Sequence, residues 1–299
     1  MTQVLAFGPW AGEFGGELEV YQGQLRYLHR RVYPDSIFIV SGYAGRAPLY
    51  EHANVYLPIP ECFEKQVRDG TYFARWNTLV ETSTEKVLGP TDSIIGEMNQ
   101  WFREEAAQHN ADECINPNTS WPIEFGDGTK QEFVLLRTPL KPADVPARSI
   151  AVFPRKRLNN EYRNWSEENW VKMVQAITQD RTAVIIGPSY EVGLKDLKGP
   201  NIVNIIGADL YTQISYLQNC AVAVAPMCGA VRFCSYVGVP VTTFAPKQYY
   251  KEVTKCEGKP IESNPFGTPV YSLDSRDDWN YSYEDVLGHL QTVTTEHNL

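Results

Sequence analysis

The sequence predicts an α/β protein in which helices cover parallel sheets, and two stretches carry this prediction. In the first, the apolar segment 3–7 is followed by a glycine-rich loop at 8–17 and then by apolar residues at helical spacing. In the second, the apolar segment 221–224 leads through small residues into a short helix and ends at another apolar strand, 241–244. Strand, loop, helix and strand in this order form the βαβ unit typical of α/β sheets.

The first half continues this pattern less regularly. Apolar residues three to four positions apart predict a helix over 18–32, and the segment 36–40 supplies a second strand. The region 44–130 contains many prolines and aromatic residues, with one clear helix expected at 94–108. A further strand is expected at 133–136. Irregular, aromatic-rich segments can shape a ligand pocket, although single aromatic residues more often belong to the core.

The second half repeats the order of strand, loop and helix, and begins with a strand at 149–153. Ser166 is expected to cap the next helix, because its hydroxyl can accept a hydrogen bond from the first turn. Trp165 and Trp170 stand at the positions of a hydrophobic staple around this cap. Asp209 is expected to cap a later helix in the same way. The other expected elements are strands at 183–186 and 202–206 and helices at 210–219 and 283–293.

The length of 299 residues suits two α/β domains. The polar segment 141–148 is punctuated by prolines and is the best candidate boundary. We therefore predict one Rossmann-like domain at 1–147 and a second at 148–280. The C-terminal helix, within 281–299, is expected to pack back toward the first domain.

The composition excludes several classes of protein. The formal net charge of −9 gives no overall bias toward nucleic acid or anionic membranes. The six cysteines show neither a CxxC pair nor a metal-binding spacing, which favours a reducing, cytoplasmic setting. No apolar run reaches transmembrane length, and the first residues lack the pattern of a signal peptide. We expect a cytoplasmic enzyme without a membrane span.

The helix that begins at Gly229 is a candidate anion site. Gly229 and Ala230 place almost no side-chain bulk on its first turn, so the backbone N–H groups can face a ligand. Arg232 adds a permanent positive charge one turn into the helix. The alternatives stay open that this stretch is only well-packed core and that Arg232 is an ordinary ion-pair residue.

The loop at 8–17 offers carboxylates. Its glycines do not form GxGxxG, which argues against NAD or FAD binding. Glu13 and Glu17 lie beside backbone that glycine lets a substrate approach closely. Glu17 can equally be an acidic residue favoured by the helix dipole at the N-terminus of the helix.

The loop at 154–166 is strongly basic within an acidic protein. Arg155, Lys156, Arg157 and Arg163 follow a predicted strand, so they are expected at the carboxyl edge of the sheet, where open α/β sheets bind ligands. Any of the three basic residues at 155–157 can instead be simply solvated.

The segment 227–240, Met-Cys-Gly-Ala-Val-Arg-Phe-Cys-Ser-Tyr-Val-Gly-Val-Pro, resembles the donor-site segment of GT-B glycosyltransferases of the heptosyltransferase type (family 9). The family pattern is Asp-Ser-Gly-Pro-Met-His-Leu-Ala-Ala-Ala-Leu-Gly-Thr-Pro, and Gly229, Gly238 and Pro240 match it without gaps. The segment 163–170 resembles the family's Lys-x-Trp-Pro stretch, and Gly187 its strand-end glycine.

The resemblance also covers the first loop, where Gly12-Glu13 falls at the family's Gly-Asp, whose acid is taken to be the general base. It departs at Met227, Cys228 and Arg232, which replace acidic, hydroxyl and histidine residues, so side-chain contacts to the donor cannot be transferred.

The resemblance implies a GT-B fold of two Rossmann-like domains that face each other across a cleft, with the donor domain at 148–280. It implies transfer of a sugar from a nucleotide-diphosphate-sugar to an acceptor hydroxyl, without a cofactor and with inversion. No DxD motif follows a predicted strand in a position to hold a divalent ion, so we predict that the reaction is metal-independent. Glu13 would be the base, with Glu17 as the second choice. The residues expected to bind the donor are Gly12, Arg155, Arg157, Arg163, Gly187, Cys228, Gly229, Ala230 and Arg232.

Other functions remain open on the sequence. The acceptor implied by the family is a lipopolysaccharide or another glycan. The basic residues from Arg137 to Arg163 also allow a nucleic-acid acceptor, such as a hydroxymethylated base in phage DNA. The same architecture serves nucleotide-sugar epimerases and hydrolases, and a non-catalytic binding protein could keep the phosphate site without a base.

Overall fold

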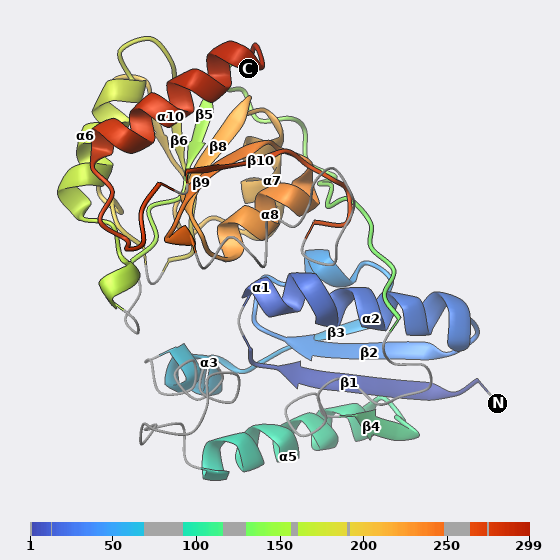
Figure 1. Ribbon diagram of the computed structural model, residues 1–299. Helices are drawn as coiled ribbons and strands as arrows, with labels where there is room; N and C mark the ends of the chain where they lie inside the picture. The colour runs from blue at the N-terminus through green and yellow to red at the C-terminus, as the bar shows by residue number, and fades with distance from the viewer. Residues whose placement is uncertain are drawn as a thin grey trace. The chain divides into compact units, whose positions relative to one another are not determined.

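The computed structural model describes residues 2–12, 14–68, 92–115, 130–156, 161–189, 192–247, 264–273 and 275–299. The chain divides into two compact units, Met1–Phe133 and Val134–Leu299. Each unit contains one parallel sheet with helices against it (Figure 1). The predicted α/β class is confirmed.

The sheet of the first unit has the strand order β3-β2-β1-β4, and its neighbouring strands are parallel. All residues of β1 are buried, as expected for a central strand covered on both faces. The strands are β1 (Val4–Trp10), β2 (Ile37–Gly42), β3 (Val55–Pro58) and β4 (Glu113–Ile115).

A helical segment from Phe14 to Val32 lies on one face of this sheet, and α5 (Asp92–Gln108) lies on the other (Figure 1). The first helix carries the predicted apolar stripe, in which Leu18, Tyr21 and Leu25 are fully buried. Two of its stretches are π-helical, yet the residues that join them keep right-handed helical dihedrals. Its parts are α1 (Phe14–Gly16), η1 (Glu17–Tyr21), α2 (Gln22–Tyr27) and η2 (Leu28–Val32). The other short helices are η3 (Ala47–Tyr50) and α3 (Glu61–Arg68).

The sheet of the second unit has the strand order β10-β9-β8-β5-β6-β7, again with parallel neighbours. Its central strands are short, mostly apolar and fully buried, which agrees with their position between two layers of helices. The strands are β5 (Ile150–Val152), β6 (Ala183–Ile185), β7 (Ile202–Asn204), β8 (Val222–Pro226), β9 (Val241–Phe244) and β10 (Val270–Leu273).

Helices α6 (Glu167–Ile177) and α10 (Tyr283–Glu296) pack together over one face of this sheet (Figure 1). Trp170 of α6 and Leu290 of α10 share a buried cluster with Val152 and its neighbours. Helices α7 (Leu210–Gln218) and α8 (Gly229–Val237) lie against each other, and α8 packs on β8 and β9. A single turn, η4 (Glu161–Arg163), precedes α6.

The predicted helix starts are confirmed. The Ser166 hydroxyl accepts a hydrogen bond from the backbone N–H of Asn169 at 3.1 Å. The Asp209 carboxylate accepts one from the N–H of Thr212 at 2.9 Å. Trp165 and Trp170 meet edge to face with their ring centroids 4.7 Å apart, as the staple requires. These local signals place both helices correctly because caps act within one turn.

The segment 133–136 is not a strand, which corrects the prediction. The Leu136 N–H donates to the Tyr236 carbonyl oxygen at 2.8 Å, and its carbonyl oxygen accepts from Gln218 at 3.2 Å. These bonds join the segment to α7 and α8 within the compact unit that begins at Val134, whereas the sequence placed the boundary after residue 147.

The C-terminal helix packs within the second unit. Its buried residues Val286 and Leu290 belong to the core of the second unit, where α10 contacts α6, β9 and β10. Within the described part of the chain, no helix has the length and hydropathy needed to cross a bilayer.

Candidate functional site

The carboxyl edge of the second sheet gathers most of the predicted donor residues. Because its strands are parallel, the segments that follow β5, β6, β8 and β9 all leave the sheet at this edge. Arg155 follows β5, Gly187 follows β6, and Cys228 follows β8. The topology therefore brings together residues that lie far apart in sequence.

The start of α8 presents backbone and little side chain. Cys228 is the N-cap in an extended conformation, and its side chain makes no capping hydrogen bond. Gly229 and Ala230 are half-buried, whereas Met227 and Cys228 are buried. The first turn therefore keeps the small-residue surface that the sequence predicts for an anion site.

Arg163 reaches this helix start from η4. Its Nη2 donates a hydrogen bond to the Met227 carbonyl oxygen at 3.2 Å. Its guanidinium carbon lies 4.9 Å from the ring centroid of Trp279, within the range of a cation–π contact. The predicted basic loop thus supplies a positive charge directly beside the residue that precedes the N-cap of α8.

Arg155 and Gly187 meet through a third residue, Val192. Arg155 forms an isolated antiparallel bridge with Val192, and a Cβ placed on Gly187 would lie 2.8 Å from a Val192 methyl group. Any side chain at 187 would therefore displace the segment that holds Arg155. Glycine at 187 therefore leaves room for Val192 beside the end of β6.

Three further residues that the sequence singled out in the second unit are Arg157, Arg232 and Gly238. Arg232 is half-buried and lies one turn into α8. Gly238 ends this helix at φ +85°, a conformation that favours glycine, so its match to the family pattern has a conformational reason. Arg157 lies outside the described residues.

In the first unit, Gly12 is required by a close contact. A Cβ at this position would lie 2.7 Å from the Trp10 indole, which is buried and stacks on Tyr21 with ring centroids 4.8 Å apart. The glycine therefore lets the loop pass over a packed aromatic pair. Glu13, the first choice for the base, lies outside the described residues.

Glu17, the second choice for the base, is fully buried. Its carboxylate accepts a hydrogen bond from the Tyr50 hydroxyl at 2.8 Å and lies 3.6 Å from Arg46 Nε. Burial raises the pKa of Glu17 from 4.5 to about 7, against the lowering effects of Arg46 and Tyr50. The Arg46 guanidinium also lies 3.8 Å from the ring centroid of Phe14. Glu17 thus links the loop to the body of the unit, and it does not face solvent.

Solved structures share the fold of this protein over almost the whole chain. E. coli ADP-heptose lipopolysaccharide heptosyltransferase II is 12% identical with a TM-score of 0.52, and each chain is covered completely. A family 9 glycosyl transferase from Veillonella parvula is 10% identical with a TM-score of 0.56, over 99% of this chain and 98% of that one. E. coli heptosyltransferase WaaC with ADP is 9% identical, with a TM-score of 0.50 and complete coverage of both chains.

The fold is that of heptosyltransferase-like GT-B glycosyltransferases. No protein-family profile matches the sequence, and no curated protein matches it at a significant level. At this low identity the GT-B fold is the shared property, so the substrate and the reaction must be argued from the residues of this chain.

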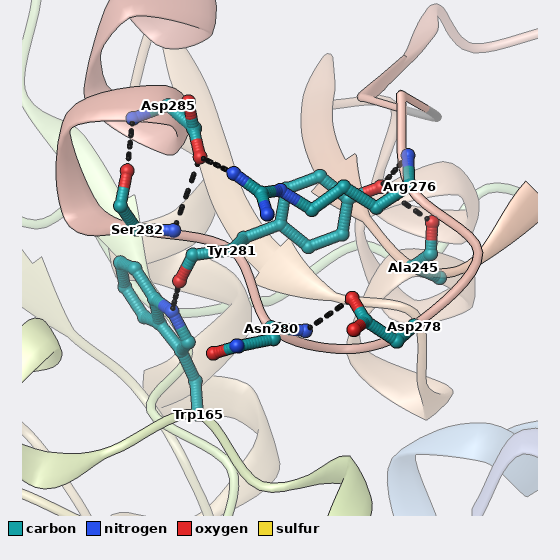
Figure 2. Close-up of polar contacts among 8 residues, drawn as sticks. All are labelled: Trp165, Ala245, Arg276, Asp278, Asn280, Tyr281, Ser282 and Asp285. Carbon is teal, nitrogen blue, oxygen red and sulfur yellow. Dashed lines mark hydrogen bonds and ion pairs between the residues drawn. The ribbon is translucent and has the colours of Figure 1, made fainter.

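Sequence reasoning missed one part of this GT-B edge, the segment 276–282. The Tyr281 hydroxyl donates to the Ala245 carbonyl oxygen at 3.0 Å and accepts from the Arg276 N–H at 3.2 Å, so the segment is tied to the end of β9 (Figure 2). Trp279 lies on this segment and meets Arg163. The available signal was a tryptophan within a run of polar residues.

The two acidic residues of this segment have partners within the fold. Asp277 lies 3.7 Å from Lys247 Nζ, and Asp278 accepts a hydrogen bond from the Asn280 N–H at 3.0 Å (Figure 2). Among the residues that the structure describes, no three His, Cys, Asp or Glu side chains gather in a way that could hold a metal ion.

Proposed function

We propose that this protein is a glycosyltransferase that moves a sugar from a nucleotide-diphosphate-sugar to an acceptor hydroxyl. The observation that carries the proposal is Arg163, which is held beside the start of α8 at the carboxyl edge of a GT-B sheet. A helix N-terminus and an arginine both stabilise the negative charge that develops on a diphosphate leaving group. Arg155 and Arg232 can add to this charge from the same edge.

In the proposed reaction the acceptor oxygen attacks the anomeric carbon of the donor. The bond from that carbon to the diphosphate oxygen breaks, its electron pair leaves with the nucleoside diphosphate, and the acceptor proton goes to Glu13. One base and one direct displacement predict inversion at the anomeric carbon. We assign the charge stabilisation to protein groups, so the proposed reaction requires neither a metal nor a cofactor.

Glu17 takes a different role from the one its position in the sequence suggested. A fully buried carboxyl that is bonded to Tyr50 and close to Arg46 is suited to hold the loop, not to accept a proton from a substrate. Because Arg46 stacks on Phe14, this network reaches the residue next to Glu13.

A sugar hydroxyl of a glycan or lipopolysaccharide is the acceptor we favour. Nucleic acid draws less support, because several members of the basic series make contacts within the fold. Arg137 donates to the Val237 carbonyl oxygen at 3.3 Å, and Arg148 donates to that of Leu299 at 3.3 Å. Arginines held in this way are less suited to track a phosphate backbone.

The test measures the melting temperature of the protein in the presence of each member of a panel of nucleoside diphosphates and nucleotide sugars. A ligand that binds only the folded state stabilises it by about 2.7 kcal/mol at one hundred times its dissociation constant. At least one member should raise the melting temperature, and Arg163→Ala should reduce the shift. If no member changes it, the transferase proposal fails. Release of free sugar without an acceptor would favour a hydrolase, and interconversion of the sugar an epimerase.

A further inference from the structure

Two segments of the second unit, 163–165 and 279–281, lie side by side. Trp165 Nε1 donates a hydrogen bond to the Tyr281 carbonyl oxygen at 2.7 Å, in the buried core (Figure 2). Two residues earlier in both segments, Arg163 lies over the ring of Trp279. The contact of Trp165 with Tyr281 therefore anchors the two segments in the core. The contact of Arg163 with Trp279 lies at the partly exposed edge beside α8, since both residues are half-buried.

The segment that carries Trp279 is held on both sides. The Lys247 N–H donates to the Arg276 carbonyl oxygen at 3.1 Å, next to the Tyr281 contact with Ala245. The Arg276 guanidinium also pairs with Asp285 at 2.9 Å, and Asp285 forms a capping box with Ser282 at the start of α10 (Figure 2). The indole of Trp279 is thus carried by a segment fixed to β9 and α10.

Arg163 has a long, flexible side chain, and its contacts with Met227 and Trp279 restrict it in complementary ways. The Met227 carbonyl oxygen receives a hydrogen bond from Nη2 at 3.2 Å, which fixes one edge of the guanidinium. The Trp279 ring lies against its face at 4.9 Å, which fixes the plane. The N–H groups of a guanidinium restricted in this way keep a defined direction, which favours bidentate binding of phosphate oxygens.

We propose that Trp279 is a positioning residue that holds the Arg163 guanidinium in the orientation that binds the donor diphosphate. The inference rests on the proposed function, because it requires Arg163 to contact the diphosphate. It assigns Trp279 no contact with the nucleobase. Direct stacking of a base on Trp279 is the alternative that the experiment must separate.

The experiment measures dissociation constants by titration calorimetry. The probes are ADP, UDP, GDP and CDP, each compared with its nucleoside and with inorganic pyrophosphate. The variants are Trp279→Ala, Trp279→Phe, Arg163→Ala and the double variant that combines Trp279→Ala with Arg163→Ala. The matched control is Tyr283→Ala, which removes the aromatic ring of a second cation–π pair, with Lys172 at 5.5 Å.

Trp279→Ala should weaken the best nucleoside diphosphate by about tenfold, the size of a partly desolvated cation–π contact. Pyrophosphate should weaken in proportion, and binding of the nucleoside should not change. Trp279→Phe should restore part of the loss, because it keeps an aromatic face. The double variant should bind no more weakly than Arg163→Ala, since the tryptophan acts through the arginine.

Additive losses in the double variant would overturn the inference, as would an equal loss for nucleoside and diphosphate, which indicates base stacking. A loss shared by Tyr283→Ala would reduce Trp279 to a general structural role and would also overturn it. If the wild-type protein binds none of the probes, the proposed function itself fails and the inference falls with it. Binding by the wild type with no effect of Trp279→Ala would overturn the inference alone.

Discussion

The Glu17 carboxyl is an ionisable group placed in the core of the first unit. Its neighbours are the Tyr50 hydroxyl, the Arg46 guanidinium and the phenol groups of Tyr21 and Tyr56. Burial outweighs the attraction of Arg46 and raises the pKa of Glu17 to about 7. The folded protein therefore holds this proton at a pH where the unfolded chain has released it.

This proton has a consequence for stability. Because the folded-state pKa lies above the unfolded value of 4.5, the contribution of Glu17 to the free energy of unfolding should fall as pH rises from about 4.5 to about 7. The full effect is about 3 kcal/mol at 1.36 kcal/mol per unit. Glu17→Gln should remove this contribution, which is measured as the difference from the wild-type pH dependence of urea unfolding between pH 4 and 8. Glu97→Gln, at an exposed position of α5, should keep the wild-type dependence. An unchanged pH dependence in Glu17→Gln would contradict the assignment.

The start of α8 lacks the features that usually stabilise a helix N-terminus. Its N-cap makes no side-chain hydrogen bond, and its first two positions carry the smallest side chains. A helix optimised only for stability would have Ser, Thr or Asp at the cap and acidic residues in the first turn. α6, with Ser166, Glu167 and Glu168, has that design within the same unit.

A negative charge placed in the first turn of α8 should therefore maintain or raise the melting temperature and weaken the binding of a nucleoside diphosphate. Ala230→Glu should leave the melting temperature unchanged or raise it, since the helix dipole favours an acid there by about 0.3–1 kcal/mol. The same change should weaken nucleoside diphosphate binding at least tenfold through charge repulsion. Ala230→Gln has nearly the same volume without charge and should weaken binding less. Equal losses in both variants would point to bulk and would argue against a phosphate at this turn.

At the scale of the whole molecule, the proposed reaction divides its work between the two units. The candidate donor residues Arg163 and Cys228 belong to the second unit, whereas Glu13 belongs to the first. Binding of the donor and activation of the acceptor should therefore be separable by mutation.

Glu13→Gln should keep the affinity for the donor nucleotide within about twofold and lower the rate of transfer by about 10²–10⁴, the usual contribution of a general base. Initial rates and calorimetry on the same preparation measure both quantities, and Glu97→Gln serves as the control. A variant that retains full turnover would remove Glu13 from the mechanism. Loss of donor affinity together with turnover would instead assign Glu13 to binding.

Sequence by itself determined the features that depend on neighbouring residues. Local chemistry determines the helix starts at Ser166 and Asp209, the parallel strands of βαβ units, and the small side chains on the first turn of α8. The basic loop was also recognisable, because charge in a loop after a buried strand points to the ligand edge of the sheet.

Only the tertiary structure decided which of these residues meet and which are buried. Glu17 looked accessible in a glycine-rich loop, but packing of Tyr21 and Tyr50 around it removes it from solvent. Trp279 lies within a run of polar residues, and its contact with Arg163 joins segments more than one hundred residues apart. Such contacts are set by how helices and sheet pack, and no periodicity or cap within one segment encodes them.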